Sequence, residues 1–129
     1  KDFGRTAARI DDAANYLPAR LTALLMALAT CIPFRKGKSA RNLKEELRFI
    51  RRYGRMHASP NSGYPEAALA GILDCRFGGP HHYFGEDCFK PYIGNRLRPL
   101  TTADMRQAVA INRCAEILMI LTGVLLYLL

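Results

Sequence analysis

Two long apolar runs constrain the fold of this chain more than any other feature. Residues 21–34 and residues 117–129 contain no charged side chain. At 1.5 Å per residue the first run reaches about 21 Å as a helix, which is short of the roughly 30 Å hydrocarbon layer of a membrane. A snorkelling Arg20 could extend that reach. Both runs therefore predict apolar helices, and whether these helices lie in a protein core or in a membrane remains open.

Helical spacing of apolar side chains continues outside these runs. Residues 3–16, 42–53 and 65–74 each show the pattern of a helix. A cap near Thr102 opens a further helix. Residues 57–99, in contrast, contain six of the ten glycines and five of the seven prolines, which is typical of an ordered loop region around a ligand. We therefore expect an all-α protein with little or no sheet, a multi-helix integral membrane bundle with a long Gly/Pro-rich loop region.

The length of 129 residues suits one domain. We divide the single unit 1–129 into a helix pair that includes the first apolar helix (1–34), a basic amphipathic helix (35–56), a motif-rich loop region with a short helix (57–99) and a C-terminal apolar helix (100–129). The chain starts at Lys1 without the pattern of a secretory leader, so we expect a fragment of a longer protein.

The positive charge is concentrated in one segment. The formal net charge is +8, and residues 35–57 hold nine Lys or Arg against two Glu. A basic amphipathic helix beside an apolar run fits the positive-inside rule and attraction to anionic headgroups, which predicts membrane lipids as a partner and a cytoplasmic position for the 35–56 loop. Nucleic acid is the competing partner. Only Phe49 and Tyr53 interleave with the basic residues and no nucleic-acid motif is present, so we predict no nucleic-acid binding.

The four cysteines lie far apart in the sequence, and no C-x-x-C pair occurs. This spacing predicts reduced thiols rather than a disulfide framework. A zinc site built from Cys75, Cys88 and either His81 or His82 is the sharper alternative, but the spacing matches no standard zinc finger.

The segment from His57 to Ala68 has the composition of a binding site at a helix entrance. Pro60 holds the preceding residue extended, Gly63 permits a turn closed to other residues, and Pro65 suits the first helical turn. Its polar groups are those of His57, Ser59, Asn61, Ser62 and Glu66, of which Asn61 or Ser62 can cap the helix. The entrance suits a phosphate or a carboxylate, while Glu66 would serve a cation, an amine or a proton. An ordinary capped helix start is the alternative.

Two adjacent carboxylates lie in the first predicted helix. Asp11 and Asn15 stand four residues apart on one face, whereas Asp12 can pair with Arg9 or Arg5. The two carboxylates are therefore predicted to meet different surroundings. A functional role for one of them and a role as solvated helix charges for both are open alternatives.

Several separated blocks together resemble one known family. The blocks are His57-x-Ser59-Pro60-Asn61-x-Gly63-x-Pro65-Glu66-Ala67-Ala68, Gly78-Gly79-Pro80, Tyr83-x-Gly85 and Pro91-x-Ile93-Gly94. They resemble the adenosylcobinamide-phosphate synthase family of cobalamin biosynthesis. The stretch Asp11-Asp12-x-x-Asn15-Tyr16-x-Pro18-Ala19-Arg20-Leu21-Thr22 is similar to that family's approach to a membrane helix. Members commonly have Pro, Ala and Trp where this chain has Ala58, Ser62 and Tyr64.

The resemblance implies a multi-pass protein of the cell inner membrane. It further implies an amide-forming carbon–nitrogen ligase that joins the corrinoid adenosylcobyric acid to aminopropanol phosphate, with ATP and Mg²⁺ as cofactors. The chain resembles the C-terminal part of the family, without its N-terminal membrane helices. We therefore expect the missing N-terminal part or a completing chain as a partner, and the isolated fragment to be inactive.

The resemblance also supplies hypotheses about individual residues. The catalytic candidates are Asp11, Asp12, His57 and Glu66, with magnesium at Asp11, Asp12 and Glu66. The candidates for binding substrate or phosphate are Asn15, Arg20, Arg52, Ser59, Asn61, Ser62, Gly63, Gly78, Gly79, Tyr83, Gly85, Glu86 and Tyr92. The alternative function is a non-catalytic, membrane-associated corrinoid-binding or interaction module, which would leave the carboxylates scattered.

Overall fold

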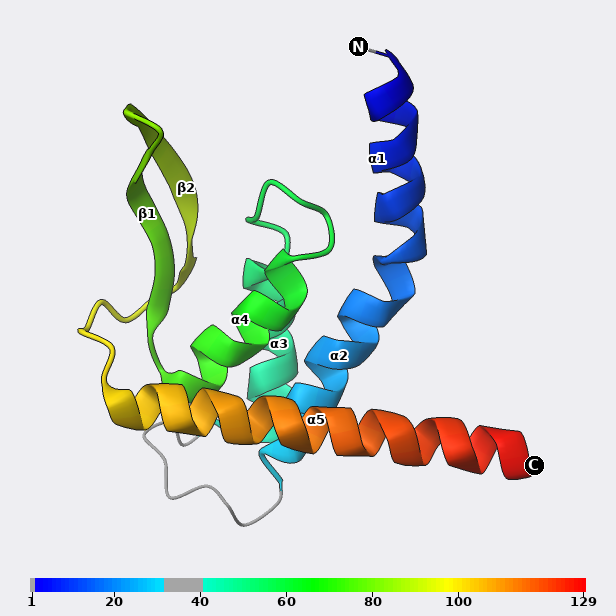
Figure 1. The fold of residues 1–129 in the computed structure, drawn as a ribbon. Helices are drawn as coiled ribbons and strands as arrows, with labels where there is room; N and C mark the ends of the chain where they lie inside the picture. Colours follow the sequence, from blue (N-terminus) through cyan, green and yellow to red (C-terminus); the bar gives the residue numbers. More distant parts are fainter. Residues whose placement is uncertain (1, 32–40) are drawn as a thin grey trace.

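The computed structural model describes residues 2–31 and 41–129 (Figure 1). In chain order the elements are α1 (Asp2–Ala14), α2 (Tyr16–Ala29), α3 (Leu43–Tyr53), α4 (Gly63–Leu73), β1 (Arg76–Tyr83), β2 (Glu86–Gly94) and α5 (Thr102–Leu128). The predicted end of the first apolar run at residues 32–34 and the beginning of the basic segment at residues 35–40 lie outside the described residues.

The expected helix pair at the N-terminus is confirmed, with a break at Asn15. The backbone N–H of Asn15 donates to the carbonyl of Asp11 at 2.9 Å, and Ala19 donates to the carbonyl of Asn15 at 3.0 Å. Pro18 lies in the first turn of α2, where its missing N–H costs no helical hydrogen bond. As a result α1 leads almost directly into α2, and Figure 1 shows α1 projecting away from the rest of the molecule.

Helix α4 is the centre of the packing. Its small residues Ala67, Ala68 and Ala70 are fully buried, which lets α2, α3 and α5 approach its backbone closely. A Cβ added to Gly71 would lie 2.1 Å from the carboxylate of Glu46 on α3, so a larger residue here would displace the Glu46 side chain. Met26 of α2 and the isoleucines at positions 50, 72 and 111 complete the main core around α4.

The predicted basic amphipathic helix is confirmed as α3. Asn42 caps it through a reciprocal pair of hydrogen bonds with Glu45, each 3.0 Å long. Phe49 and Ile50 are buried, while Arg51 is exposed on the other side of the helix. The basic residues of α3 are exposed, as the sequence pattern predicts, but the pattern also puts Leu47 on the apolar side, where it is 39% exposed, and the buried side includes Glu46.

The expectation of an all-α protein is wrong, because a β-hairpin occupies part of the predicted loop region 57–99. Strands β1 and β2 pair antiparallel from Arg76 opposite Gly94 to Tyr83 opposite Glu86. The register shifts between Phe77 and Gly79, where Gly78 and Gly79 have positive φ values of 87° and 99°. These glycines, which suggested a loop, instead form a bulge within the strand.

Two prolines of the hairpin likewise suggested a loop region instead of strands. Pro80 and Pro91 lie within the strands, and proline in a run normally argues against a strand because it cannot donate to the ladder. In a sheet of two strands both strands are edges, so each proline can turn its nitrogen away from the partner strand. The hairpin packs through its base, where Ile93 is buried, against α4.

The expected multi-helix integral membrane bundle is also wrong. Within residues 2–31 and 41–129, only α5 is long and apolar enough to cross a membrane. Helix α2 has 14 residues and buries Ala23, Leu25 and Met26 in the protein core. A short apolar run has the same sequence pattern in a core helix and in a membrane helix. Its burial against α4 indicates that α2 is a core helix in this structure.

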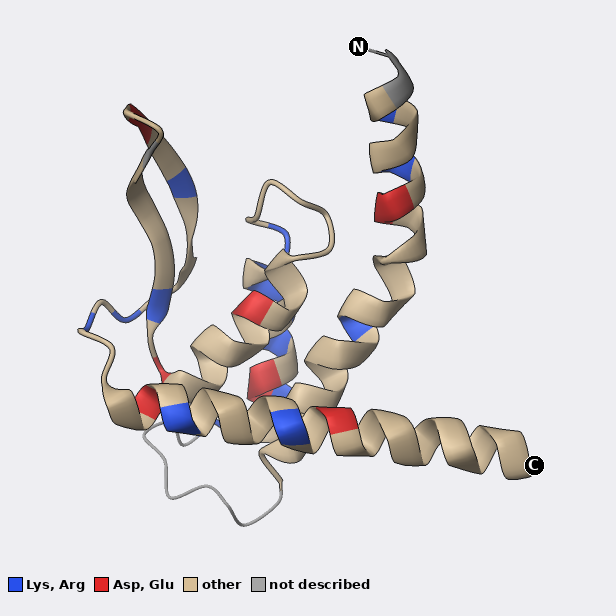
Figure 2. Ribbon diagram, viewed as in Figure 1, with Lys and Arg blue, Asp and Glu red and all other residues tan. Residues whose placement is uncertain are grey.

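Helix α5 differs from α2 because half of it is left uncovered by the rest of residues 2–31 and 41–129. Ile111 and Ala115 are buried, but Leu121, Leu125 and Leu128 are between 59% and 73% exposed. Figure 2 shows no charged residue on the half of α5 that extends beyond the other helices. This apolar segment, residues 117–129, is the feature of the described structure that favours contact with a membrane.

An ionic network joins α4 to the hairpin end and to the start of α5. Asp74 ends α4 in a left-handed conformation, with φ of 51°, and binds Arg41 at 3.3 Å and Arg96 at 2.6 Å. Arg98 donates to both carboxylate oxygens of Asp104 at 2.8 Å and to the carbonyl oxygen of Asp74 at 3.1 Å. The network fixes the direction in which α5 leaves the core.

Candidate functional site

The loop of residues 57–62 meets the α1–α2 junction, and Asn61 makes the connection. The side-chain amide of Asn61 donates to the carbonyl of Asp12 at 2.8 Å, and its oxygen accepts from Nη1 of Arg20 at 3.3 Å. Asn61 is only 5% exposed, so both ends of its side chain are used. Asn61 therefore contacts two residues of another sequence block, Arg20 through its side chain and Asp12 through its backbone carbonyl instead of its predicted catalytic carboxylate.

Ser59 organises the turn that carries Asn61. Its hydroxyl oxygen accepts the backbone N–H groups of Asn61 and Ser62, each at 3.3 Å, and lies 3.2 Å from the Ser62 hydroxyl, which donates to it. The predicted cap at Asn61 or Ser62 is not made. Ser62 occupies the N-cap position of α4 without a side-chain cap, because its hydroxyl bonds to Ser59 instead.

His57 and Glu66 lie close together at the entrance of α4. The backbone N–H of Ser59 donates to His57 Nδ1 at 2.9 Å, so in the neutral ring the proton is on Nε2. Nε2 lies 3.8 Å from Oε2 of Glu66, and the two side chains are 26% and 38% exposed. The Glu66 carboxylate is therefore accessible to solvent and faces the protonated nitrogen of His57.

Gly63 serves close packing rather than the turn expected from the sequence. A Cβ at this position would lie 2.3 Å from the carbonyl oxygen of Gly54 and 2.8 Å from Cβ of His57. Only glycine allows the start of α4 to approach the end of α3 this closely. Gly63 therefore lets His57 pack beside the start of α4.

Arg20 lies between two aromatic rings. Its guanidinium carbon is 3.4 Å from the centroid of the Tyr16 ring and 4.2 Å from the centroid of the Tyr64 ring. Its Nη1 also donates to the carbonyl of Tyr16 at 2.8 Å. The prediction of site residues omitted both tyrosines. Tyr16 could have been found from its spacing of four residues from Arg20 on one helix, whereas no local pattern connects Tyr64 to Arg20.

A shallow pocket of about 270 Å³ opens beside this contact. Its polar lining comes from Asn15, Thr22, Asn61 and Ser62, with Pro18, Ala19 and Pro65 as its other walls. Asn15 also donates to the Asp11 carboxylate at 2.9 Å, so the two residues predicted to share one helix face are hydrogen-bonded. Asp11 is therefore linked to the pocket through Asn15.

The structure does not gather the carboxylates expected to hold magnesium. Among the described residues, no group of three or more His, Cys, Asp or Glu side chains could hold a metal ion. This finding covers Asp11, Asp12 and Glu66 as well as the zinc alternative at Cys75 and Cys88. The magnesium assignment stays a prediction.

The remaining predicted residues lie elsewhere. Arg52 is exposed on α3, with its guanidinium 5.4 Å from the Tyr53 ring. The hairpin carries Gly78, Gly79, Tyr83, Gly85, Glu86 and Tyr92. Tyr92 packs on Gly79 and under the guanidinium of Arg76. Figure 1 shows the hairpin and α1 on opposite sides of the loop before α4, so these residues form no common site with Arg20.

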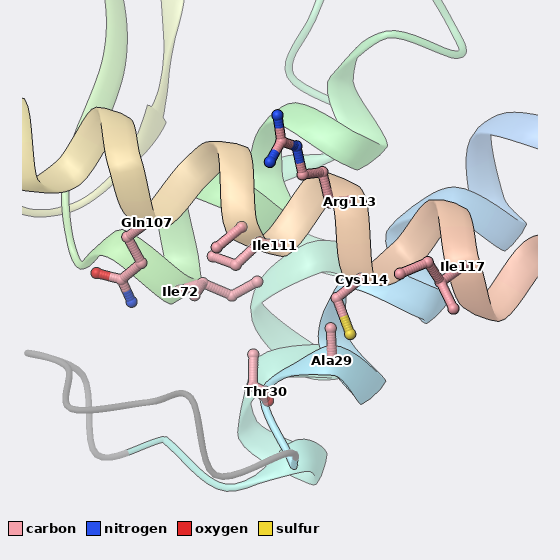
Figure 3. A pocket seen from close by; sticks show the side chains of 9 residues that line it. Ala29, Thr30, Ile72, Gln107, Ile111, Arg113, Cys114 and Ile117 are labelled. Atoms are coloured by element: carbon pink, nitrogen blue, oxygen red, sulfur yellow. The ribbon is translucent and has the colours of Figure 1, made fainter.

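A second pocket, of about 240 Å³, lies between α2, α4 and α5 (Figure 3). Its walls are mainly apolar, and the Cys114 side chain points from α5 toward Ala29 on α2. None of the predicted site residues lines this pocket. The contacts at the α1–α2 junction therefore remain the better candidate site, because polar groups converge there.

Comparison with known proteins matches the chain to one family. A family model described as CobD/Cbib protein matches residues 1–112. The chain is 46% identical over 119 residues to "Cobalamin biosynthesis protein CobD" of Geobacter metallireducens, covering 92% of this chain and 36% of that protein. Proteins of the same name from Desulfotalea psychrophila and Klebsiella pneumoniae are 48% and 43% identical, covering 82% and 83% of this chain and 30% and 32% of theirs.

The chain thus spans about a third of the length of these curated relatives. No solved structure matches the chain at a significant level.

Proposed function

Because the chain belongs to the CobD/Cbib protein family, we propose that it acts in cobalamin biosynthesis as part of an amide-forming enzyme. The reaction joins adenosylcobyric acid to aminopropanol phosphate. The observation that carries this proposal is the convergence of two polar sequence blocks, in which Asn61 connects Asp12 and Arg20. His57 and Glu66 lie at the same helix entrance.

Amide formation requires a group that removes a proton from the incoming ammonium. We assign this role to Glu66, because its carboxylate is partly exposed and His57 presents Nε2–H toward it. His57 orients and stabilises the carboxylate rather than acting as the base, since its Nδ1 already accepts the Ser59 N–H. The freed amine nitrogen then forms the C–N bond with the activated carboxyl carbon, whose leaving group departs with the bonding electron pair.

We propose the cofactors ATP and Mg²⁺ from the family resemblance alone. ATP would supply the activation of the corrinoid carboxyl group. For Mg²⁺, the described residues form no group of three or more metal-binding side chains, so the ion would rest on one or two carboxylates together with phosphate oxygens of the substrates. The residues assigned above act on the amine and its proton alone.

Substitution of Glu66 in the full-length enzyme tests the proposal. The enzyme is incubated with adenosylcobyric acid, aminopropanol phosphate and MgATP, and the condensed corrinoid is measured by mass. We expect Glu66→Gln to lower turnover by at least about a hundredfold, the size of a general-base contribution. Glu116→Gln, an exposed carboxylate on α5, is the matched control. Normal turnover of the Glu66→Gln enzyme would remove Glu66 from the mechanism.

A second candidate function is a non-catalytic corrinoid-binding module. The absence of a gathered carboxylate cluster from the described residues favours it, because binding alone needs no such cluster. The same assay separates the two functions. Variants of a binding module would raise KM and leave kcat unchanged, whereas loss of the general base lowers kcat.

We further propose that the chain associates with the cell inner membrane through α5, with the basic segment 35–56 on the cytoplasmic side. The length and composition of α5 support the first part. The exposed positions of Lys44, Arg48 and Arg51 on α3 support the second.

A further inference from the structure

Arg20 is a half-buried cation that has no carboxylate partner within the described residues. All the hydrogen bonds that the structure records for its guanidinium leave from Nη1, to the carbonyl of Tyr16 and to the side chain of Asn61. Both acceptors are neutral. Its positive charge is therefore not balanced by an acidic side chain, although charged groups partly removed from water are usually paired.

The two tyrosine rings fix the plane of the guanidinium. Tyr16 and Tyr64 lie within 3.4 Å and 4.2 Å of its carbon, which is the range of cation–π attraction. The rings contact the guanidinium carbon, whereas the N–H groups at the edge of the guanidinium are the donors that a further ligand would use. Because Nη1 is occupied, the edge formed by Nη2 and Nε remains, and two parallel N–H groups are the geometry that binds an oxyanion through two hydrogen bonds.

A pocket lies beside the Arg20 contact. Thr22 offers a hydroxyl donor in its lining, whereas the Ser62 hydroxyl already donates to Ser59 and the Asn15 amide donates one of its two N–H groups to Asp11. Asn61 belongs to this lining and also holds Nη1 of Arg20, so the pocket and the guanidinium share one wall. A tetrahedral anion has more acceptor oxygens than a carboxylate, so it can accept from both N–H groups of the guanidinium edge and keep oxygens for a further donor or for water.

We propose that Arg20, held between Tyr16 and Tyr64, binds the phosphate group of a phosphate monoester. The inference deepens the proposed function and rests on it for the identity of the substrate, since aminopropanol phosphate carries such a group. Tyr16 and Tyr64 are positioning residues, because they act on the ligand through the orientation of Arg20.

Inorganic phosphate is the probe for this site. The whole chain is labelled with ¹⁵N-arginine in a neutral detergent, and the Nε–Hε resonances are followed during titration at constant ionic strength. The resonance that disappears in Arg20→Lys identifies Arg20. We expect this resonance to shift saturably with phosphate, and acetate to bind at least about fivefold more weakly because it carries a single charge.

Two tyrosine variants separate positioning from folding. Tyr64→Phe keeps the ring and should change phosphate affinity less than about twofold, whereas Tyr64→Leu should weaken it about fivefold or more. Arg106→Ala, which removes an exposed arginine on α5, is the control and should leave the titration unchanged. Circular dichroism verifies that each variant is folded.

An absent Arg20 shift, a shift shared equally by all arginines, or equal affinities of Tyr64→Phe and Tyr64→Leu would overturn the proposal. The titration requires no turnover. Its failure would therefore remove the phosphate site at Arg20 and leave the proposed amide formation to its own assay.

Discussion

Asn61 and Asp12 are 49 residues apart in the sequence and are joined by a hydrogen bond of 2.8 Å from the Asn61 amide to the Asp12 carbonyl. Among the described helices and strands, the neighbouring α2 is the main contact of α1. The bond therefore ties the end of α1 to the loop that carries Ser59 and His57. It makes the α1–α2 junction and the entrance of α4 one site.

Asn61→Ala should destabilise the junction. The substitution removes the donor to the Asp12 carbonyl and the acceptor for Arg20, so we expect a loss of about 1–3 kcal/mol in the free energy of unfolding. Chemical denaturation measures this free energy of unfolding. Asn95→Ala is the control, because Asn95 is exposed in a bend after β2 and should change stability by less than about 0.5 kcal/mol. Equal effects of the two substitutions would contradict a central role for Asn61.

Local patterns in the sequence predicted the helices well, because helix formation depends on neighbouring residues. Helix α3 (Leu43–Tyr53), predicted over residues 42–53, and the shared helix face of Asp11 and Asn15 are examples. The hairpin could not be predicted in this way. Gly78 and Gly79 indicate a break in regular structure, and only the pairing with β2 shows that this break is a bulge.

The site was predicted in part for the same reason. The polar residues between His57 and Glu66 are adjacent in sequence, so their grouping follows from local chain geometry. The contact of Tyr64 with Arg20 joins α4 to α2, and such a contact depends on how the helices pack. Packing also decides that α2 is a core helix, which its composition alone left open.

Glycine substitutions in the hairpin should separate backbone strain from steric overlap. Gly94 has φ of 105°, and an added Cβ would lie 2.2 Å from the Cys75 carbonyl oxygen. Gly85 has φ of 84° with nothing near its Cβ position. We expect Gly85→Ala to cost about 1–2 kcal/mol from the left-handed conformation alone, and Gly94→Ala to cost clearly more. Gly4→Ala in α1, where space is open, should be neutral or slightly stabilising. Thermal unfolding of the three variants measures these differences, and equal losses at Gly85 and Gly94 would refute the predicted overlap.

Asp74 should make stability depend on pH. Burial raises the pKa of its carboxyl group, but the hydrogen bond from Arg96 and the charges of Arg41 and Arg96 lower it by more, so the net pKa lies below the ordinary value. A lowered pKa in the folded state stabilises the protein above the unfolded pKa of about 3.9. That stability is lost as the pH falls toward the folded pKa.

Asp74→Asn tests this charge without changing the backbone, because asparagine tolerates the left-handed conformation at this position. We expect a loss of about 1–3 kcal/mol at pH 7, and a smaller difference from the unsubstituted protein below about pH 4. Chemical denaturation at pH 7 and pH 3 measures the free energy of unfolding of both proteins. A difference that is constant between pH 7 and pH 3 would show that the charge of Asp74 makes no contribution.

The cysteines should differ in reactivity according to their burial. Burial raises the pKa of the Cys75 thiol to about 11, whereas Cys31 and Cys88 are exposed. At pH 8 the thiolate fraction of Cys75 is then about a hundredfold below that of an ordinary thiol. Iodoacetamide should label Cys31 and Cys88 in the folded protein, and Cys75 only after unfolding, as read by mass spectrometry. Labelling of Cys75 at the rate of Cys88 would contradict its burial.

Membrane insertion of α5 should depend on its second half. Leu121 is 59% exposed and lies in the uncharged segment 117–129, so a lysine there would have to enter the hydrocarbon layer, at a cost of roughly 2.5–3.5 kcal/mol near the helix centre. Met105 is similarly exposed, at 62%, but lies between Asp104 and Arg106 at the polar end of α5. We therefore expect Leu121→Lys to reduce the membrane fraction that resists alkaline carbonate extraction, and Met105→Lys to leave it unchanged. In a membrane, Leu121 lies in the hydrocarbon layer and Met105 near its polar surface, so only a lipid environment makes the two positions differ. Equal effects of the two substitutions would therefore show that protein, and not lipid, covers the exposed apolar half of α5.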